Sequence, residues 1–184
     1  MTTAIEPGLR DAMLRATPNL RAFAISLTSN VDRADDLVQE TLMRAIANIG
    51  RFQPGTNMQA WLFTILRNLF HSEYRKRRRE VEDADGKYAA TLAVQPHQGA
   101  HLDFGDLQKA LARLPHDQRE ALLLVGASGF SYEQAAEICG CAVGTIKSRV
   151  NRARTRLAEL MHLTDIDEDL GPDRVTLSAL QAVA

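Results

Sequence analysis

The sequence lacks most of the features that define disulfide-rich, membrane-spanning and β-sheet proteins. It has only two cysteines, Cys139 and Cys141, too few for a disulfide framework, and we expect them to be packing or turn residues. No apolar run is long enough to span a bilayer, and the segment MTTAIEPGLRDAM lacks the basic and apolar regions of a signal peptide. A cytoplasmic protein is therefore expected. Aromatic residues make up 5% of the chain and no strand-like alternation is sustained, so helices should dominate.

The signatures of enzymatic chemistry are also missing. The chain contains no phosphate-cradling glycine loop, no nucleophile motif and no paired metal-ligand spacing. His97 and His101 lie in a segment that we expect to be a solvated linker, where lone histidines are seldom ligands. The sequence therefore predicts neither an enzyme nor a bound metal or cofactor.

The net charge is only −1, but the charges are segregated along the chain. Residues 75–79 are five consecutive cations, and residues 142–158 contain five more without an acid. Acids gather instead at residues 80–85 and 165–173. Because a phosphate responds to the local field and not to the total charge of the chain, the two basic segments are candidate nucleic-acid contacts.

Residues 131–160 predict a short helix, a turn and a longer basic helix. Ser131 and Gln134 have the spacing of an N-terminal capping box, and Gly140 can end the first helix with a positive φ. The apolar residues of the second helix fall on a single stripe: Val143, Ile146, Val150, Ala153, Leu157 and Leu160. Its other face is purely basic and polar. This pattern favours a DNA-binding helix-turn-helix over a solvated surface helix, which normally mixes both signs of charge.

Two more helices are predicted near the N-terminus. The first covers residues 7–30, with a restart expected at Pro18 because proline is tolerated at a first helical position but not inside a helix. We expect Asp32 to cap the second helix and Gly50 to end it. Its apolar positions include Ile46.

The remaining periodicity indicates two helical domains. Asn57 is expected to cap a helix that runs to Arg79, with Trp61 on its apolar face and not serving as a stacking platform. Residues 80–103 are polar and contain proline and glycine, which indicates a flexible linker. Helical periodicity resumes over residues 104–162, and residues 163–184 form a tail that is either a short docking helix or frayed. The expected fold class is all-α, with domains at residues 7–79 and 104–162.

Several segments together resemble the extracytoplasmic-function (ECF) sigma factors of bacterial RNA polymerase. These segments are AWLFTILRN, YRKRRR, the linker that follows them and, most specifically, VGTIKSRVNRAR at residues 143–154. More narrowly, FQPGTNMQAWLFTILRN and RKRRREVEDADG resemble the EcfG group, the general-stress sigma factors of alphaproteobacteria. That group is regulated by an anti-sigma factor, NepR, and by a response regulator, PhyR, that mimics the sigma factor.

The resemblance implies that the N-terminal domain is a sigma-2 domain. Its second helix, residues 35–49, would dock on the β′ clamp helices of the polymerase through an exposed polar strip: Asp36, Gln39, Glu40 and Arg44. A solvated helix face is the alternative for each of these residues. The loop at residues 52–58 and the helix after it would melt and read the −10 element, with Asn57 and Asn68 near a flipped base. The flanking phosphates would contact Arg67, Arg75, Lys76, Arg77, Arg78 and Arg79.

The C-terminal domain would be a sigma-4 domain that reads the duplex −35 element. The resemblance places base-edge and groove contacts on Lys147, Ser148, Asn151 and Arg152, which helical geometry puts on one face opposite the apolar stripe. Thr145, Arg149 and Arg154 would touch phosphates. Ala142 departs from the family, because relatives often have proline at that position.

The expected function is to bind core RNA polymerase, through its β′ clamp helices and β flap, and to direct promoter-specific initiation under the control of a NepR-like anti-sigma factor. No membrane or small-molecule ligand is expected. One alternative is a sigma-like decoy that captures the anti-sigma factor without binding DNA. Another is a stand-alone helix-turn-helix regulator, which would bind promoter DNA without polymerase.

Overall fold

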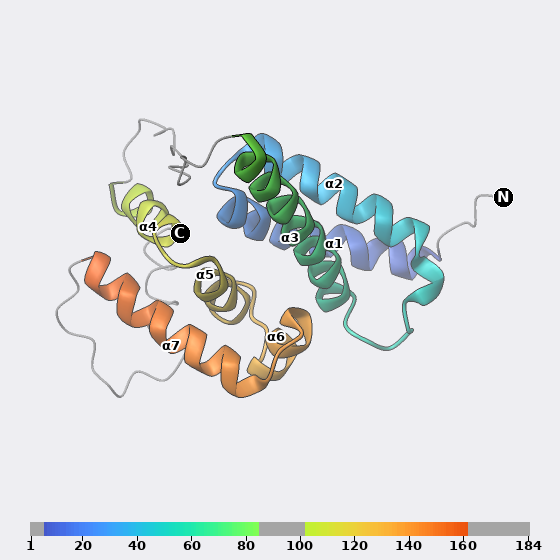
Figure 1. Ribbon diagram of the computed structural model, residues 1–184. Coiled ribbons are helices and arrows are strands. Elements are labelled where there is room, and N and C mark those ends of the chain that lie inside the picture. Colours follow the sequence, from blue (N-terminus) through green and yellow to red (C-terminus); the bar gives the residue numbers. More distant parts are fainter. Residues whose placement is uncertain (1–5, 85–101, 162–184) are drawn as a thin grey trace. The chain divides into compact units, whose positions relative to one another are not determined.

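The computed structural model describes residues 6–84 and 102–161, and every regular element in these ranges is helical (Figure 1). The structure divides into two compact units, residues 1–93 and residues 94–184, which confirms the all-α fold with two domains. None of the described helices is long and apolar enough to cross a membrane. The predicted tail at 163–184 and the part of the predicted linker at 85–101 lie outside the described residues.

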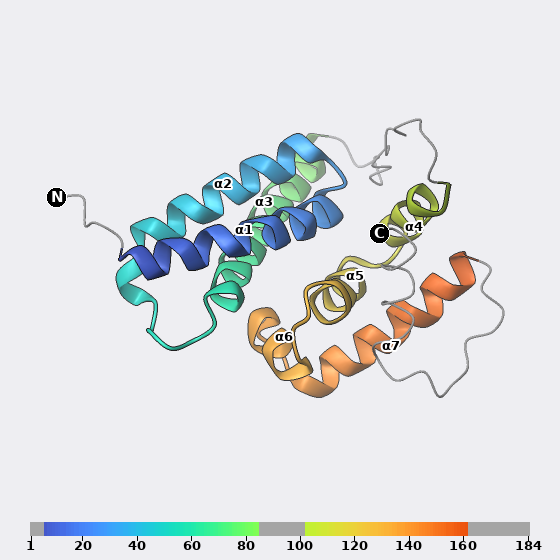
Figure 2. The same cartoon turned by 180° about the vertical axis from the view of Figure 1, so that it is seen from behind.

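The first unit is built from three helices that pack against one another, as Figures 1 and 2 show. They are α1 (Pro7–Thr28), α2 (Val31–Ala47) and α3 (Met58–Ala84), with a 3-10 turn η1 (Ile49–Arg51) after α2. The core contains a pair of phenylalanine rings, Phe23 of α1 and Phe63 of α3, with centroids 5.0 Å apart. Around this pair the largest fully buried apolar side chains of the unit are Leu20, Leu27, Leu62 and Leu66.

The restart expected at Pro18 is wrong, because α1 runs through this residue without a break. Pro18 lies on the exposed face of the helix, and Thr17 beside it donates from Oγ1 to the carbonyl of Met13 at 3.0 Å. The buried face of α1 continues on both sides of the proline, from Met13 to Leu20. Packing of that continuous face offsets the hydrogen bond that the proline removes.

The ends of α2 also differ from the prediction. Asn30, and not Asp32, is the N-cap: its Oδ1 accepts a hydrogen bond from the backbone N–H of Arg33 at 2.8 Å. The helix ends at Ala47, and Gly50 lies in the following η1 turn. Asparagine and aspartate are both strong caps, so residue type alone does not decide between two such residues that lie this close together.

Helix α3 begins as predicted, because Asn57 Oδ1 accepts from the backbone N–H of Ala60 at 3.2 Å. It extends to Ala84, five residues beyond its predicted end at Arg79, so the first part of the predicted linker is helical. Glutamate and alanine are good helix formers, and no glycine or proline occurs between Arg79 and Gly86. Acidic composition alone is therefore a poor sign that a helix has ended.

The second unit contains α4 (Leu102–Ala112), α5 (His116–Leu122), a π-helical turn η2 (Leu123–Ala127), α6 (Tyr132–Cys139) and α7 (Val143–Leu160). Helix α7 packs mainly against α5 and α6. The predicted capping box is confirmed: Gln134 N–H donates to Ser131 Oγ at 3.2 Å, and Ser131 N–H donates to Gln134 Oε1 at 3.0 Å. Gly140 has φ 63° and ends α6, as predicted. The predicted stripe of α7 is buried at Ile146, Val150 and Ala153.

Candidate nucleic-acid interface

Helix α7 presents the predicted base readers on the face opposite its buried stripe. Lys147, Asn151 and Arg152 are exposed, and Ser148 is half-buried. Ile146 and Val150, on the other side, are almost completely buried. The helix is therefore fixed by its apolar side while its cations and hydrogen-bonding groups face outward, which is the arrangement that a major-groove helix requires.

Two of these side chains are linked along the helix. Arg152 Nη2 donates to Ser148 Oγ at 3.3 Å, and Ser148 Oγ donates to the carbonyl of Thr145 at 3.1 Å. A guanidinium held in this way loses less conformational freedom when it binds a base edge. The sequence predicted that the four candidate readers share one face of the helix but did not predict this chain of hydrogen bonds.

Lys147 contacts the neighbouring helix. Its Nζ lies 5.8 Å from the centroid of the Tyr132 ring, in a cation–π arrangement, and Tyr132 is the first residue of α6. Sequence reasoning did not identify Tyr132. The only signal for it was its position after the Ser131 cap, which does not indicate which residue of α7 its ring will contact.

Arg149, predicted to contact a phosphate, lies between α5 and α7. Its Nε is 3.1 Å from Asp117 Oδ2, and its Nη1 donates to Cys141 Sγ at 4.0 Å. The other predicted phosphate contacts, Thr145 and Arg154, are half-buried. The five cations of α7 are therefore not equivalent, and Arg149 joins the turn and the first turn of α5 to the recognition helix.

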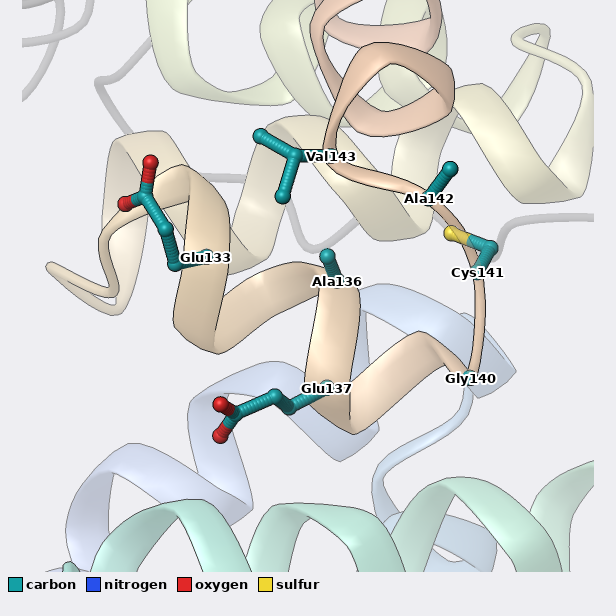
Figure 3. Close-up of a pocket in the computed structure, with 7 residues that line it drawn as sticks. All are labelled: Glu133, Ala136, Glu137, Gly140, Cys141, Ala142 and Val143. Carbon is teal, nitrogen blue, oxygen red and sulfur yellow. The ribbon is translucent and has the colours of Figure 1, made fainter.

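The turn between α6 and α7 lines an open pocket of about 600 Å³ (Figure 3). Glu133 and Glu137 lie four residues apart along α6, and the rest of the lining is mostly apolar. The lining residues are Glu133, Ala136, Glu137, Gly140, Cys141, Ala142 and Val143. They include no cation, so this pocket is a poor site for a phosphate.

In the first unit, the predicted −10 residues lie on the loop before α3 and along that helix. Asn57 and Asn68 are exposed and Arg67 is half-buried. The loop turns at Gly55, which has φ 89°. Trp61 is half-buried, with its ring centroid 5.3 Å from that of the buried Phe52, so it packs against this loop as part of the structural support for the segment.

The cations near the end of α3 are exposed at Arg75, Lys76, Arg77 and Arg79, and the side chain of Arg78 lies outside the described residues. Arg77 Nη2 is 3.7 Å from Glu73 Oε2. Sequence reasoning missed Arg33 of α2, whose pKa is lowered mainly by burial and then by the positive charge of Arg77. The basic end of α3 is therefore extended by a cation from a second helix.

The predicted polar strip on α2 is present but is not purely polar. Asp36, Gln39 and Arg44 are exposed and Glu40 is half-buried, with Arg44 Nε 2.7 Å from Glu40 Oε1. Met43 is 63% exposed, and Ile46, one of the apolar positions of the predicted helix, is 48% exposed. The spacing of residues 36, 39, 40, 43 and 46 places them along one side of the helix. The exposed surface therefore combines charges with apolar area, as a protein-binding surface does.

Each unit matches the family model of one region of the Sigma-70 proteins. Residues 13–80 match Sigma-70 region 2, and residues 104–157 match Sigma-70 region 4. The ECF RNA polymerase sigma factor EcfG of Rhodopseudomonas palustris (strain TIE-1) is 72% identical over 165 residues, covering 90% of this chain and 91% of the relative.

Solved structures give the same result. The sigma factor RpoE of Bartonella quintana, in complex with the anti-sigma factor NepR, has a TM-score of 0.78 and 56% identity, over 87% of this chain and 100% of that chain. The PhyRSL–NepR complex from Sphingomonas sp. Fr1 has a TM-score of 0.62 and 20% identity, over 89% of this chain and 95% of that chain, which shows a shared fold. With both regions matched and a close curated relative over nearly its whole length, the chain belongs to the ECF sigma factors of RNA polymerase.

Proposed function

We propose that the chain binds core RNA polymerase in the cytoplasm and directs initiation at promoters that its two units read jointly. The family is one of transcription initiation factors and not of known enzymes. The observation that carries the proposal is the outer face of α7, which offers cations and hydrogen-bonding groups without an acid between residues 142 and 158 on a helix fixed by its buried stripe. The domain boundaries predicted from the sequence, 7–79 and 104–162, become 7–84 and 102–162 in our proposal, because α3 runs to Ala84 and α4 begins at Leu102.

The second unit reads the −35 duplex. Lys147, Ser148, Asn151 and Arg152 contact base edges in the major groove, where lysine and arginine suit guanine and asparagine suits adenine. Thr145 and Arg154 contact phosphates, which fix the register of the helix but carry no sequence information. Arg149 was predicted to contact a phosphate, but because its Nε lies 3.1 Å from Asp117 Oδ2 we assign it to bracing α7 against α5.

The first unit reads and melts the −10 element. Asn57 uses its side-chain oxygen to cap α3, which leaves its amide N–H groups for a flipped base, and Asn68 lies three turns along the same helix. The flanking phosphates are held by the exposed cations of α3 and by Arg67. Arg33 adds to the positive field at the end of α3, because the charges of Arg33 and Arg77 influence each other.

The exposed side of α2 docks on the β′ clamp helices, and the second unit contacts the β flap. Asp36, Gln39, Glu40 and Arg44 supply the polar contacts, and Met43 and Ile46 supply apolar area that water otherwise covers. A NepR-like anti-sigma factor holds the chain inactive until a general stress releases it. The support is the 56% identical relative, whose structure is a complex with NepR.

The two alternatives have weaker support. A decoy that only captures the anti-sigma factor has no use for concentrated cations on both DNA-facing surfaces, and this chain is 20% identical to the PhyRSL chain but 72% identical to the EcfG sigma factor. A stand-alone regulator would bind DNA without polymerase, whereas a sigma factor of this type should bind it poorly alone.

Transcription in vitro tests the proposal. Core polymerase from Rhodopseudomonas palustris is incubated with a promoter library whose −35 and −10 segments are randomised, with and without this chain. We expect transcripts from a defined subset of promoters only when the chain is present, and we expect Arg152→Ala to relax the −35 preference of that subset. The absence of promoter-specific transcripts would overturn the sigma-factor function, and binding of the free chain to the selected promoters as tightly as the holoenzyme would favour the stand-alone regulator.

A further inference from the structure

The cation–π contact between the two helices of the helix-turn-helix joins a proposed base reader to a residue with no assigned role. Tyr132 begins α6 and is half-buried, whereas Lys147 lies on the second turn of α7 and is exposed. The ammonium lies 5.8 Å from the ring centroid, within the range of about 6 Å at which the quadrupole of an aromatic face attracts a cation. The contact therefore restrains the end of a long side chain that would otherwise move freely.

Both ends of this contact are attached to rigid backbone. Tyr132 directly follows Ser131, the N-cap, whose hydroxyl accepts from Gln134 at 3.2 Å. Lys147 follows Ile146, which is completely buried. The ring and the lysine are thus held by two helices that pack against each other, so their relative position is a property of the motif and not of one flexible loop.

The carboxylate of Glu133 lies close enough to Lys147 for the two charges to influence each other. The pKa of Glu133 is lowered mainly by hydrogen bonding with its own backbone and with Ser131 and, to a smaller extent, by the positive charge of Lys147. The ammonium therefore lies in the field of Glu133 as well as near the ring of Tyr132.

We propose that Tyr132 is a positioning residue for −35 recognition, whose ring holds the ammonium of Lys147 in the orientation in which it meets the base edge. This inference rests on the proposed function, in which Lys147 reads a base. Arg152 is held within α7 by Ser148 at 3.3 Å, whereas Lys147 is held from α6. The first helix of the motif thus contributes to sequence discrimination through a side chain of the second.

This role fixes what removal of the ring or of the hydroxyl should do to binding. Loss of the ring should lower discrimination between the preferred −35 base and its substitutes, because a freely rotating lysine contacts several groups equally well. Loss of the hydroxyl alone should have little effect, because the ring face makes the contact. The salt dependence of binding should stay constant, since no phosphate contact is lost.

The test measures binding of the holoenzyme, formed from the full chain and Rhodopseudomonas palustris core polymerase, to a selected promoter duplex and to duplexes with single −35 substitutions. The variants are Tyr132→Leu, Tyr132→Phe and Lys147→Met, with both Tyr132 changes repeated in the Lys147→Met chain. We expect Tyr132→Leu to lower discrimination at one base pair about two- to fivefold, the factor that an exposed cation–π contact supplies. Tyr132→Phe should match the wild type, and Tyr132→Leu should have no further effect once Lys147 is methionine.

The results separate the inference from the function on which it rests. If Lys147→Met leaves discrimination unchanged, Lys147 is not a base reader and that part of the proposed function fails. If Lys147→Met lowers discrimination but Tyr132→Leu does not, the positioning role fails while the base reader stands. An equal effect of Tyr132→Leu with and without Lys147, or an equal loss in Tyr132→Phe, would also overturn the positioning role.

A second measurement does not depend on DNA binding or on the stability of the leucine variant. In the NMR spectrum of the free chain, the ring should shift the εCH2 proton signals of Lys147 upfield in the wild type and in Tyr132→Phe. Signals at the ordinary lysine position in both chains would show that the ring does not hold the lysine, and would overturn the inference.

Discussion

At the scale of single residues, the cations of α7 look alike in the sequence but differ in their surroundings. Lys147 contacts a ring on α6, Arg149 pairs with Asp117 of α5, and Arg152 contacts Ser148 within its own helix. Spacing along the chain predicted which of these residues lie on the polar face. It did not predict their partners on other helices, because these depend on how α5 and α6 pack against α7.

The first prediction concerns the pair of Arg149 and Asp117. If this pair mainly braces the recognition helix, Arg149→Gln and Asp117→Asn should each lower the free energy of unfolding by about 0.2–1 kcal/mol, the usual value of a partly exposed ion pair. The double variant should lose little more than either single variant, because both remove the same contact. Chemical denaturation measures these values, with Arg156→Gln as the control, since Arg156 pairs with Glu159 of the same helix.

The salt dependence of promoter binding gives the second half of this test. The slope of log K against log salt should stay the same in Arg149→Gln, whereas loss of a phosphate contact reduces it by about 0.9. Arg149 would instead be assigned to a phosphate if Arg149→Gln reduced this slope and if Asp117→Asn did not lower the free energy of unfolding as much as Arg149→Gln does.

A pH prediction comes from Asp35, which accepts two hydrogen bonds from Arg21, at 2.6 Å from Nε and 3.1 Å from Nη2. Hydrogen bonding by Arg21 lowers the pKa of Asp35. Since the folded pKa lies below the unfolded value of about 3.9, the stabilisation is complete above that pH and is lost as the pH falls through the folded pKa. The melting temperature of Asp35→Asn should therefore lie below that of the wild type at neutral pH, and the gap should close under acid conditions.

Arg21→Gln serves as the matched variant for this pH series. It removes the same ion pair from the other side and should give a gap that closes over the same range. A gap between wild type and Asp35→Asn that persists at a pH well below 3.9 would show that the asparagine acts through packing and not through the lost charge.

At the scale of helices, the N-cap of α2 gives a direct test of a failed prediction. Asn30→Ala should lower the free energy of unfolding by about 1 kcal/mol, because the N–H of Arg33 then loses its 2.8 Å partner. Asp32→Ala removes only a favourable charge from the first turn and should cost less, about 0.3–1 kcal/mol at low salt. Thermal or chemical unfolding compares the two, and a larger loss for Asp32→Ala would restore Asp32 as the cap.

The same scale shows which local signals the sequence carries reliably. The caps at Asn57 and Ser131 and the end at Gly140 were correct, because each joins a strong side-chain preference to the start or end of an apolar stripe. Pro18 misled, since the packing of the opposite face of α1 outweighs its local cost. The predicted end of α3 at Arg79 was wrong for a different reason. The acidic charge of residues 80–84 was interpreted as the end of the helix, although their helix propensity continues.

At the scale of the whole molecule, each unit has its own apolar core, and the candidate DNA contacts lie on both units. Phe63 is completely buried between the helices of the first unit, and Ile146 is completely buried in the second. The bipartite arrangement was predictable from sequence, because two sets of apolar stripes are separated by residues without periodicity. The exposure of Met43 and Ile46 was not predictable, because the sequence does not show whether a neighbouring helix covers an apolar residue at the edge of a stripe.

Separate cores predict that damage to one unit leaves the other folded. Phe63→Ala should cost about 3–5 kcal/mol and Ile146→Ala about 2–5 kcal/mol, each in its own unit. Hydrogen exchange measured by mass spectrometry should show faster exchange in α1, α2 and α3 for Phe63→Ala, with α5 and α7 unchanged, and the reverse pattern for Ile146→Ala. Faster exchange in all of these helices for either variant would mean that the two units unfold as one cooperative body. The two proposed DNA-reading units would then not be independently stable.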